Sequence, residues 1–126
     1  MNVETIELVA VVGRLLLGGL FVVGGVHHFF IVPMIADAID KRGVPFPKFV
    51  FWAGTIFQLV AGACLMLGFY VIFAAAGLIG FTLAASMMML NFWNMQGQDR
   101  TNAINGWLSN FAVIGGLLIA MAQAAS

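Results

Sequence analysis

Residues 8–32 read LVAVVGRLLLGGLFVVGGVHHFFIV, a stretch in which Arg14 is the only Lys, Arg, Asp or Glu. The hydrocarbon core of a bilayer is about 30 Å thick and an α-helix rises about 1.5 Å per residue, so roughly 20 apolar residues are enough to cross it. The stretch is long enough and apolar enough to form a membrane-spanning helix.

Three further stretches have the same character and cover residues 49–67, 69–90 and 106–123. The 126-residue chain is 63% hydrophobic and 8% charged, whereas soluble domains are about 45–50% apolar and about 25% charged. So few charged side chains cannot cover the surface of a soluble fold of this size. The sequence therefore predicts an all-α fold, a polytopic membrane protein whose single domain (residues 1–126) is a bundle of four transmembrane helices.

The segment after the first span is predicted to form a short helix lying in the membrane interface, because its apolar and charged residues fall on opposite helical faces. The apolar face contains Met34, Ile35, Ala38 and Ile39, and the other face contains Asp37, Asp40 and Lys41.

The distribution of positive charge predicts the orientation. With four spans, the loops at residues 33–48 and 91–105 lie on one side of the membrane, and they contain four of the five Lys and Arg residues. The positive-inside rule places these loops in the cytoplasm. The five basic residues are balanced by five acidic ones, so the chain lacks the basic surface that nucleic-acid binding needs, and we expect no nucleic-acid partner.

Small residues spaced four apart allow membrane helices to approach closely. Such residues recur on each predicted span, in stripes that include Ala76–Gly80–Ala84 and Ala112–Gly116–Ala120. The glycines expected to pack helices together are Gly18, Gly25, Gly54, Gly62, Gly80 and Gly116.

Polar side chains within a span are costly, so each is a candidate functional residue. Arg14 lies about two turns inside the first span, where it can extend to the near surface or act on a buried ion. His27 and His28 project about 100° apart on a helix and cannot ligate one ion from one face. His28 can hydrogen-bond a quinone carbonyl or an anionic head group; the alternative is a polar residue at the interface with no ligand.

Gln58 lies in mid-span, one turn from Gly54 and from Gly62 on the same face. This position favours a hydrogen bond to a neighbouring helix. The complete set of candidate polar or quinone-proximal residues is Arg14, His27, His28, Gln58, Trp93, Asn94 and Asn110.

The residues that bind redox cofactors are scarce in this chain. Cys64 is the only cysteine, which excludes an intrachain disulfide, a dithiol redox pair and a zinc knuckle. Both histidines lie on one predicted helix, so two of them cannot face each other across a haem. Met87, Met88 and Met89 fan around a helix and favour packing over a copper site. We expect no metal and no cofactor held by this chain, apart from a quinone.

Several segments resemble the DoxX-like family of small four-helix membrane proteins. They are Arg14–Gly18 with Phe21, Gly24–His27, Gly43–Pro45, Gln58–Gly68, Phe92–Trp93 and Asn110–Leu118. The family commonly has glutamate where Gln58 stands. The resemblance implies a membrane protein associated with respiratory, sulfur-oxidising or oxidative-stress complexes, one of which is a thiosulfate:quinone oxidoreductase. We expect a location in a prokaryotic plasma membrane.

The sequence leaves three functions open. The first is a membrane-anchoring or scaffolding subunit of a respiratory or quinone-linked redox complex, contacting lipid and either other membrane subunits or further copies of itself. In this role the chain is a non-catalytic subunit. The second is a stand-alone membrane oxidoreductase with Arg14, His27, His28 and Trp93 around a quinone. The third is a small-solute carrier, although no broken helix or inverted repeat marks a transport site.

Overall fold

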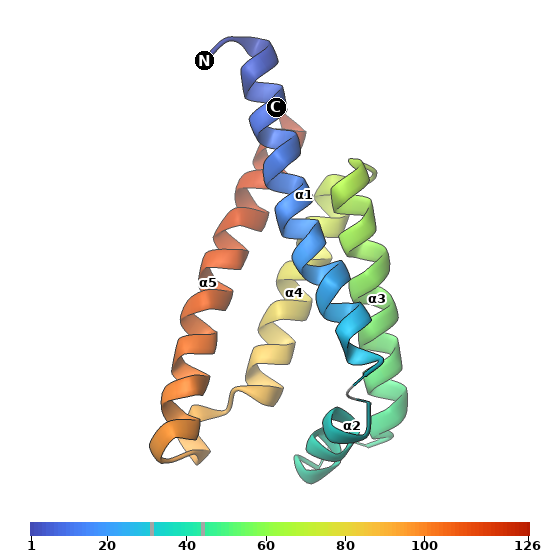
Figure 1. Ribbon diagram of the computed structural model, residues 1–126, viewed down its shortest axis with the longest axis vertical. Helices are drawn as coiled ribbons and strands as arrows, with labels where there is room; N and C mark the ends of the chain where they lie inside the picture. Colours follow the sequence, from blue (N-terminus) through green and yellow to red (C-terminus); the bar gives the residue numbers. More distant parts are fainter. Residues whose placement is uncertain (31, 44) are drawn as a thin grey trace.

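The computed structural model describes residues 1–30, 32–43 and 45–126, without the side chains of residues 32–36. Helix α1 (Val3–His28) is followed by α2 (Val32–Lys41), α3 (Pro47–Leu67), α4 (Val71–Met89), the short 3-10 helix η1 (Phe92–Asn94) and α5 (Gly97–Ala125) (Figure 1). The described residues contain no strand. Helices α1, α3, α4 and α5 are long and apolar enough to cross a membrane, so the predicted all-α, four-span membrane fold is confirmed.

The short helix predicted between the first two spans is α2, which lies across the end of the bundle in Figure 1. Ile39, on its expected apolar face, is buried. The side chains of Met34 and Ile35 on the same face, and Val44 in the following loop, lie outside the described residues.

Three helices are longer than the predicted spans: α3 begins at Pro47 instead of residue 49, and the bounds of α1 and α5 differ more. Helix α1 begins at Val3 instead of residue 8, because the Asn2 side chain caps it by accepting a hydrogen bond from the Thr5 N–H at 2.8 Å; it ends at His28 instead of residue 32. Helix α5 begins at Gly97 instead of residue 106, so much of the predicted loop at 91–105 is helical. Its polar first turns include a hydrogen bond between Gln98 and Asn102, a pair four residues apart that stabilises a solvated helix.

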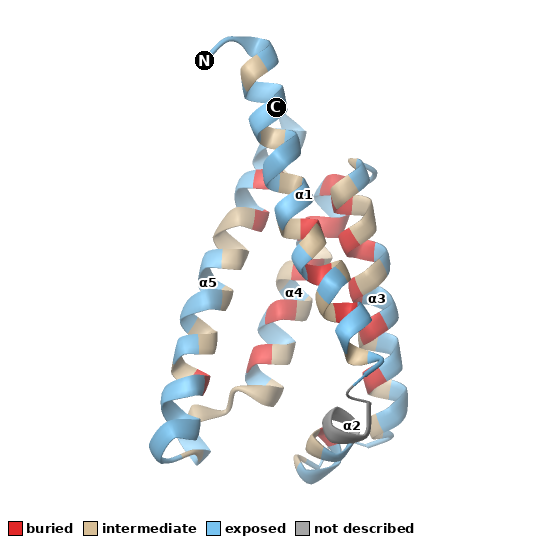
Figure 2. Cartoon of the chain, viewed as in Figure 1, coloured by how far each residue is buried: buried red, intermediate tan, exposed pale blue. Residues whose placement is uncertain are grey.

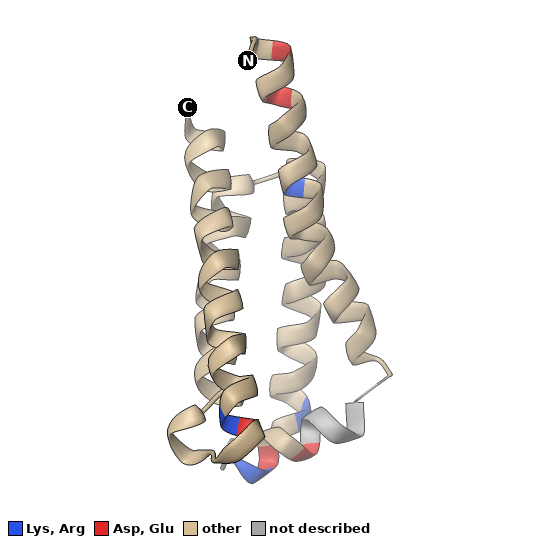
Figure 3. Ribbon diagram, turned by 60° about the vertical axis from the view of Figure 1, so that its left-hand side comes forward, with Lys and Arg blue, Asp and Glu red and all other residues tan. Residues whose placement is uncertain are grey.

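The helices associate as two pairs. Helix α1 packs mainly against α3 and α5 mainly against α4, and contacts between α3 and α4 join the pairs. Both chain termini lie at one end of the bundle and α2 and η1 at the other (Figure 1). Apart from Arg14 within α1, the charged residues lie toward these two ends of the ribbon (Figure 3).

The core is narrow and the outer surface is apolar. The buried segments gather mainly where α1, α3 and α4 come together (Figure 2). Leu65, Leu78 and Leu117 are fully buried in one apolar cluster, whereas Leu16 and Phe73 are 72% and 76% exposed. So many exposed large apolar side chains would make the chain insoluble in water, but they match the interior of a bilayer.

The glycines of α1 and α3 bring these two helices into close contact. A Cβ atom at Gly18 would lie 2.5 Å from the carbonyl oxygen of Gly62, and one at Gly25 would lie 2.7 Å from a methyl carbon of Leu59. Gly54 and Gly116 lie against Phe81 and Leu17, with ideal Cβ distances of 3.3 and 3.2 Å.

The small-residue stripe of α4 is placed differently from our expectation. Ala76, Gly80 and Ala84 are exposed, and a Cβ at Gly80 would meet no described atom within 4 Å. Apolar residues surround α4 on every side, so its sequence does not mark the face that packs. The buried residues are Val71, Ala74, Ala75, Leu78, Thr82 and Ser86.

Candidate functional site

A cavity of about 340 Å³ lies between α3 and α4, beside the last residue of α1. This volume falls within the range of about 300–1,000 Å³ that is usual for small-molecule sites. Three lining residues have polar side chains, His28, Thr55 and Gln58. The remaining lining residues are Ile39, Val50, Phe51, Gly54, Phe81, Ala84, Ala85, Met88 and Met89.

The His28 ring is held in place by two contacts with α3. Its Nδ1 lies 3.0 Å from the hydroxyl oxygen of Thr55, and the ring packs against Phe51 with centroids 5.6 Å apart. Thr55 is only 1% exposed. When the Thr55 hydroxyl donates to Nδ1, the ring hydrogen is on Nε2, so that Nε2 can donate to a guest. His27 is exposed, as expected for a neighbour about 100° around the helix.

Gln58 connects α1 to α3 beside the same cavity. Its amide Nε2 donates to the backbone carbonyl oxygen of Phe21 at 2.8 Å, and the side chain is 6% exposed. A Cβ at Gly24 would lie 2.9 Å from this nitrogen, so the missing side chain of Gly24 makes room for the amide.

The other candidate residues lie elsewhere. Arg14 lies near the middle of α1, with its Nη1 2.6 Å from where a Cβ of Gly68 would stand, at the turn between α3 and α4. Trp93 and Asn94 line a second cavity. Asn110 donates from Nδ2 to the Ser86 hydroxyl at 2.6 Å and so ties α5 to α4. The structure thus brings together His28 and Gln58, and separates them from Arg14 and Asn110.

Asn110→Ala is expected to lower the free energy of unfolding by about 0.6 kcal/mol, and at most about 1.7 kcal/mol, the range for interhelical hydrogen bonds in membranes. Unfolding in mixed detergent micelles measures this loss. Ser109→Ala is the matched control, because Ser109 is exposed on the preceding residue of α5. Equal losses for the two variants would contradict a specific tie from Asn110 to Ser86.

The second cavity, of about 650 Å³, adjoins the first, because Ala84 and Met88 line both. It is more polar: its other lining residues are Lys41, Arg42, Met87, Asn91, Trp93 and Asn94. Among the described residues, no three His, Cys, Asp or Glu side chains are grouped as metal ligands would be.

Sequence reasoning missed Thr55 and Arg42. Thr55 precedes Gln58 by three residues, a spacing that places both on one helical face, and that signal was available. In the sequence, Arg42 is a basic residue in a predicted loop, and nothing distinguishes it from other such residues. Only the packing of α2 near α4 shows that Arg42 lines a cavity.

Comparison with known proteins identifies the family. The model of the family described as DoxX matches residues 9–91. The chain belongs to the DoxX family. The resemblance seen in the sequence is thereby confirmed. The match runs from the first turns of α1 to the end of α4 and covers every lining residue of the first cavity, whereas α5 lies outside it. No curated protein and no solved structure matches the chain.

Proposed function

We propose that this DoxX-family protein is an integral membrane subunit of a quinone-linked redox complex, and that the cavity between α3 and α4 receives the quinone ring. The supporting observation is the cavity itself, which combines apolar walls with the His28 ring fixed by Thr55. Such a site, apolar with a few well-placed polar groups, is typical of ligand pockets.

The lining residues suit a flat ring with two carbonyl oxygens. Phe51, Phe81 and Met88 present aromatic and thioether surface to the ring faces. When the Thr55 hydroxyl donates its hydrogen bond to Nδ1 of His28, the hydrogen of the ring is on Nε2. Nε2 then donates to one carbonyl oxygen of the quinone. A quinone, when bound, accepts two electrons and two protons. The apolar walls exclude water from it, and His28 orients it.

A subunit role is favoured over a stand-alone enzyme because the chain has one cysteine, Cys64. Dithiol oxidation within the chain therefore cannot supply two electrons, and we assign the electron donor to a redox centre of a partner subunit. The exposed face of α4 around Ala76 and Gly80 has the small residues on which membrane helices associate.

We also assign the α2 end of the bundle to the cytoplasm. The residues that lie in connections or at helix ends on that side are Lys41, Arg42, Lys48 and Arg100. Such basic residues are retained in the cytoplasm during insertion.

His28→Ala is expected to weaken the binding of a short-chain quinone about fivefold, since a hydrogen bond contributes about 1 kcal/mol. Quenching of tryptophan fluorescence in detergent measures the affinity, because Trp52 lies 5.1 Å from the Phe51 ring of the cavity wall. His27→Ala is the matched control, with an exposed side chain on the adjacent residue, and it should bind as the unmodified protein does.

Equal quinone affinity for the His28→Ala and His27→Ala variants would overturn the assignment of the cavity. The subunit role has a separate test, which is mass spectrometry of the proteins that co-purify in mild detergent. Isolation of this chain alone would contradict that role.

A further inference from the structure

The second cavity places two cations beside an apolar wall at the α2 end of the bundle. Lys41 and Arg42 come from the end of α2, and Asn91, Trp93 and Asn94 come from the connection after α4. The apolar part consists of Ala84, Met87 and Met88 on α4. Among the described residues that line it there is no Asp or Glu. Asp37, which pairs with Lys41, is not part of the lining.

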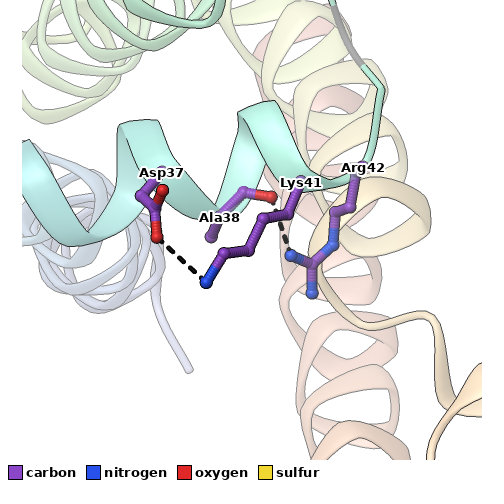
Figure 4. Close-up of polar contacts among 4 residues, drawn as sticks. All are labelled: Asp37, Ala38, Lys41 and Arg42. Atoms are coloured by element: carbon purple, nitrogen blue, oxygen red, sulfur yellow. Dashed lines mark hydrogen bonds and ion pairs between the residues drawn. The ribbon is translucent and has the colours of Figure 1, made fainter.

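Arg42 is fixed by neutral acceptors. Its Nη1 donates to the carbonyl oxygen of Ala38 at 2.9 Å, and its Nη2 lies 3.3 Å from Oδ1 of Asn91. In Figure 4 the guanidinium lies on the other side of the Lys41 side chain from Asp37, with Nη1 turned toward the Ala38 carbonyl oxygen. Across the described residues, Asp37–Lys41 is the only ion pair, and residues 31–36 and 44 include no Asp or Glu. Arg42 therefore has a fixed position, while its charge has no carboxylate partner.

Lys41 is available to a second anion. Its side chain and that of Asp37 are 74% and 61% exposed, with 3.1 Å between Nζ and Oδ2. Exposed ion pairs of this kind contribute little to stability, so an incoming phosphate can compete with Asp37 for the ammonium group.

The neighbouring groups match the rest of a phospholipid. Asn91 uses Oδ1 to accept from Arg42, which leaves its Nδ2 as a donor for an anionic oxygen. Trp93 is 55% exposed, and tryptophan is enriched at the depth of lipid head groups. Met87 and Met88 continue the cavity along α4 with apolar surface, where an acyl chain can lie.

From this arrangement we infer that the second cavity binds the head group of an anionic phospholipid, with Lys41 and Arg42 on the phosphate and an acyl chain along Met87 and Met88. The two cations distinguish this site from the quinone site, because neither of them lines the first cavity, although Ala84 and Met88 line both cavities.

The test compares lipids and variants in detergent solution. Native mass spectrometry follows binding of a short-chain phosphatidylglycerol and of the phosphatidylcholine with the same chains, and inorganic phosphate is added as a competitor. The unmodified protein should prefer phosphatidylglycerol. Arg42→Gln and Lys41→Gln should each weaken its binding about fivefold, the effect of roughly one basic residue near anionic lipid.

Lys48→Gln is the matched control, because Lys48 is an exposed cation at the same end of the bundle and does not line the cavity. It should change the affinity less than twofold. An equal loss of phosphatidylglycerol affinity in Lys48→Gln would show that the effect comes from general surface charge. It would overturn the proposal that the lipid binds in the second cavity. Equal binding of the two lipids, or binding of free phosphate as tight as that of phosphatidylglycerol, would overturn the lipid assignment.

The lipid-binding test remains decisive even if the Arg42→Gln variant does not fold. Arg42→Gln removes the bond to the Ala38 carbonyl, so circular dichroism is measured for each variant. If Arg42→Gln does not fold, Lys41→Gln decides, since the Lys41 side chain is 74% exposed and its loss leaves the helix contacts intact. Arg42→Lys keeps the charge and should keep most of the preference for the anionic lipid.

Discussion

Gly18→Ala is expected to lower the free energy of unfolding by about 1–3 kcal/mol, the usual cost of forcing extra volume into a packed contact. The new methyl carbon would lie 2.5 Å from the carbonyl oxygen of Gly62 and 3.0 Å from the backbone nitrogen of Met66. Backbone atoms cannot turn aside as the end of a side chain can, so α1 and α3 must separate. Unfolding in mixed micelles measures the loss.

Gly19→Ala is the matched control for this prediction. Gly19 is the next residue of α1, and a Cβ there would meet no described atom within 4 Å. The same methyl group is added to the same helix at the same depth, and the stability should be unchanged or slightly higher, because alanine favours the helix. Similar losses in both variants would show that the contact between Gly18 and Gly62 is not a close one.

Gly68→Ala is expected to destabilise the turn between α3 and α4 by roughly 1–2 kcal/mol. Gly68 ends α3 with φ at +80°, a left-handed conformation that costs other residues about this much. A Cβ there would also lie 2.6 Å from Nη1 of Arg14, so the arginine must move. Thermal unfolding in detergent measures the loss.

Two comparisons separate the backbone from the arginine contact. Gly43 has a similar φ of +77° but a Cβ there meets no described atom within 4 Å, so Gly43→Ala reports the backbone strain alone. In an Arg14→Ala background, Gly68→Ala should cost less than in the unmodified chain. An identical cost in the two backgrounds would contradict the placement of Arg14 against this turn.

Arg14 illustrates how far sequence reasoning reached. The sequence showed a cation inside the first span and left open whether it reaches the surface or acts on an ion. The structure places its guanidinium against Gly68, at the carboxyl end of α3, where the helix dipole favours a positive charge. That contact joins residues more than fifty positions apart, and no local pattern predicts it.

The cavity residues show a similar division. His28 and Gln58 were candidates because polar groups in a span are costly, a rule that needs only the sequence. Thr55 was overlooked because threonine is common in membrane helices and carries no charge. Its contact with His28 at 3.0 Å depends on the close approach of α1 to α3, which small residues such as Gly18 and Gly25 allow.

The number of helices was predictable from the sequence, but not all of their boundaries were. The predicted spans were correct in number because hydropathy and length are measured against the bilayer, which acts on each helix separately. The start of α5 at Gly97 was missed. Its first residues are polar, and such residues can stabilise a helix while lowering the mean hydropathy from which the span was predicted.

The sequence by itself determined that this chain has four membrane spans, that its charged residues other than Arg14 lie outside the apolar stretches, and that it has a single cysteine. These properties follow from the composition, and from comparing the length of each apolar stretch, at a fixed rise per residue, with the thickness of the bilayer. Only the tertiary structure decided which face of α4 is buried, that His28 meets Thr55 beside a cavity, and that Arg42 lines a second one. Those contacts depend on the rotation and register of helices that are apolar on every side, and these are set by close contacts between residues distant in the sequence.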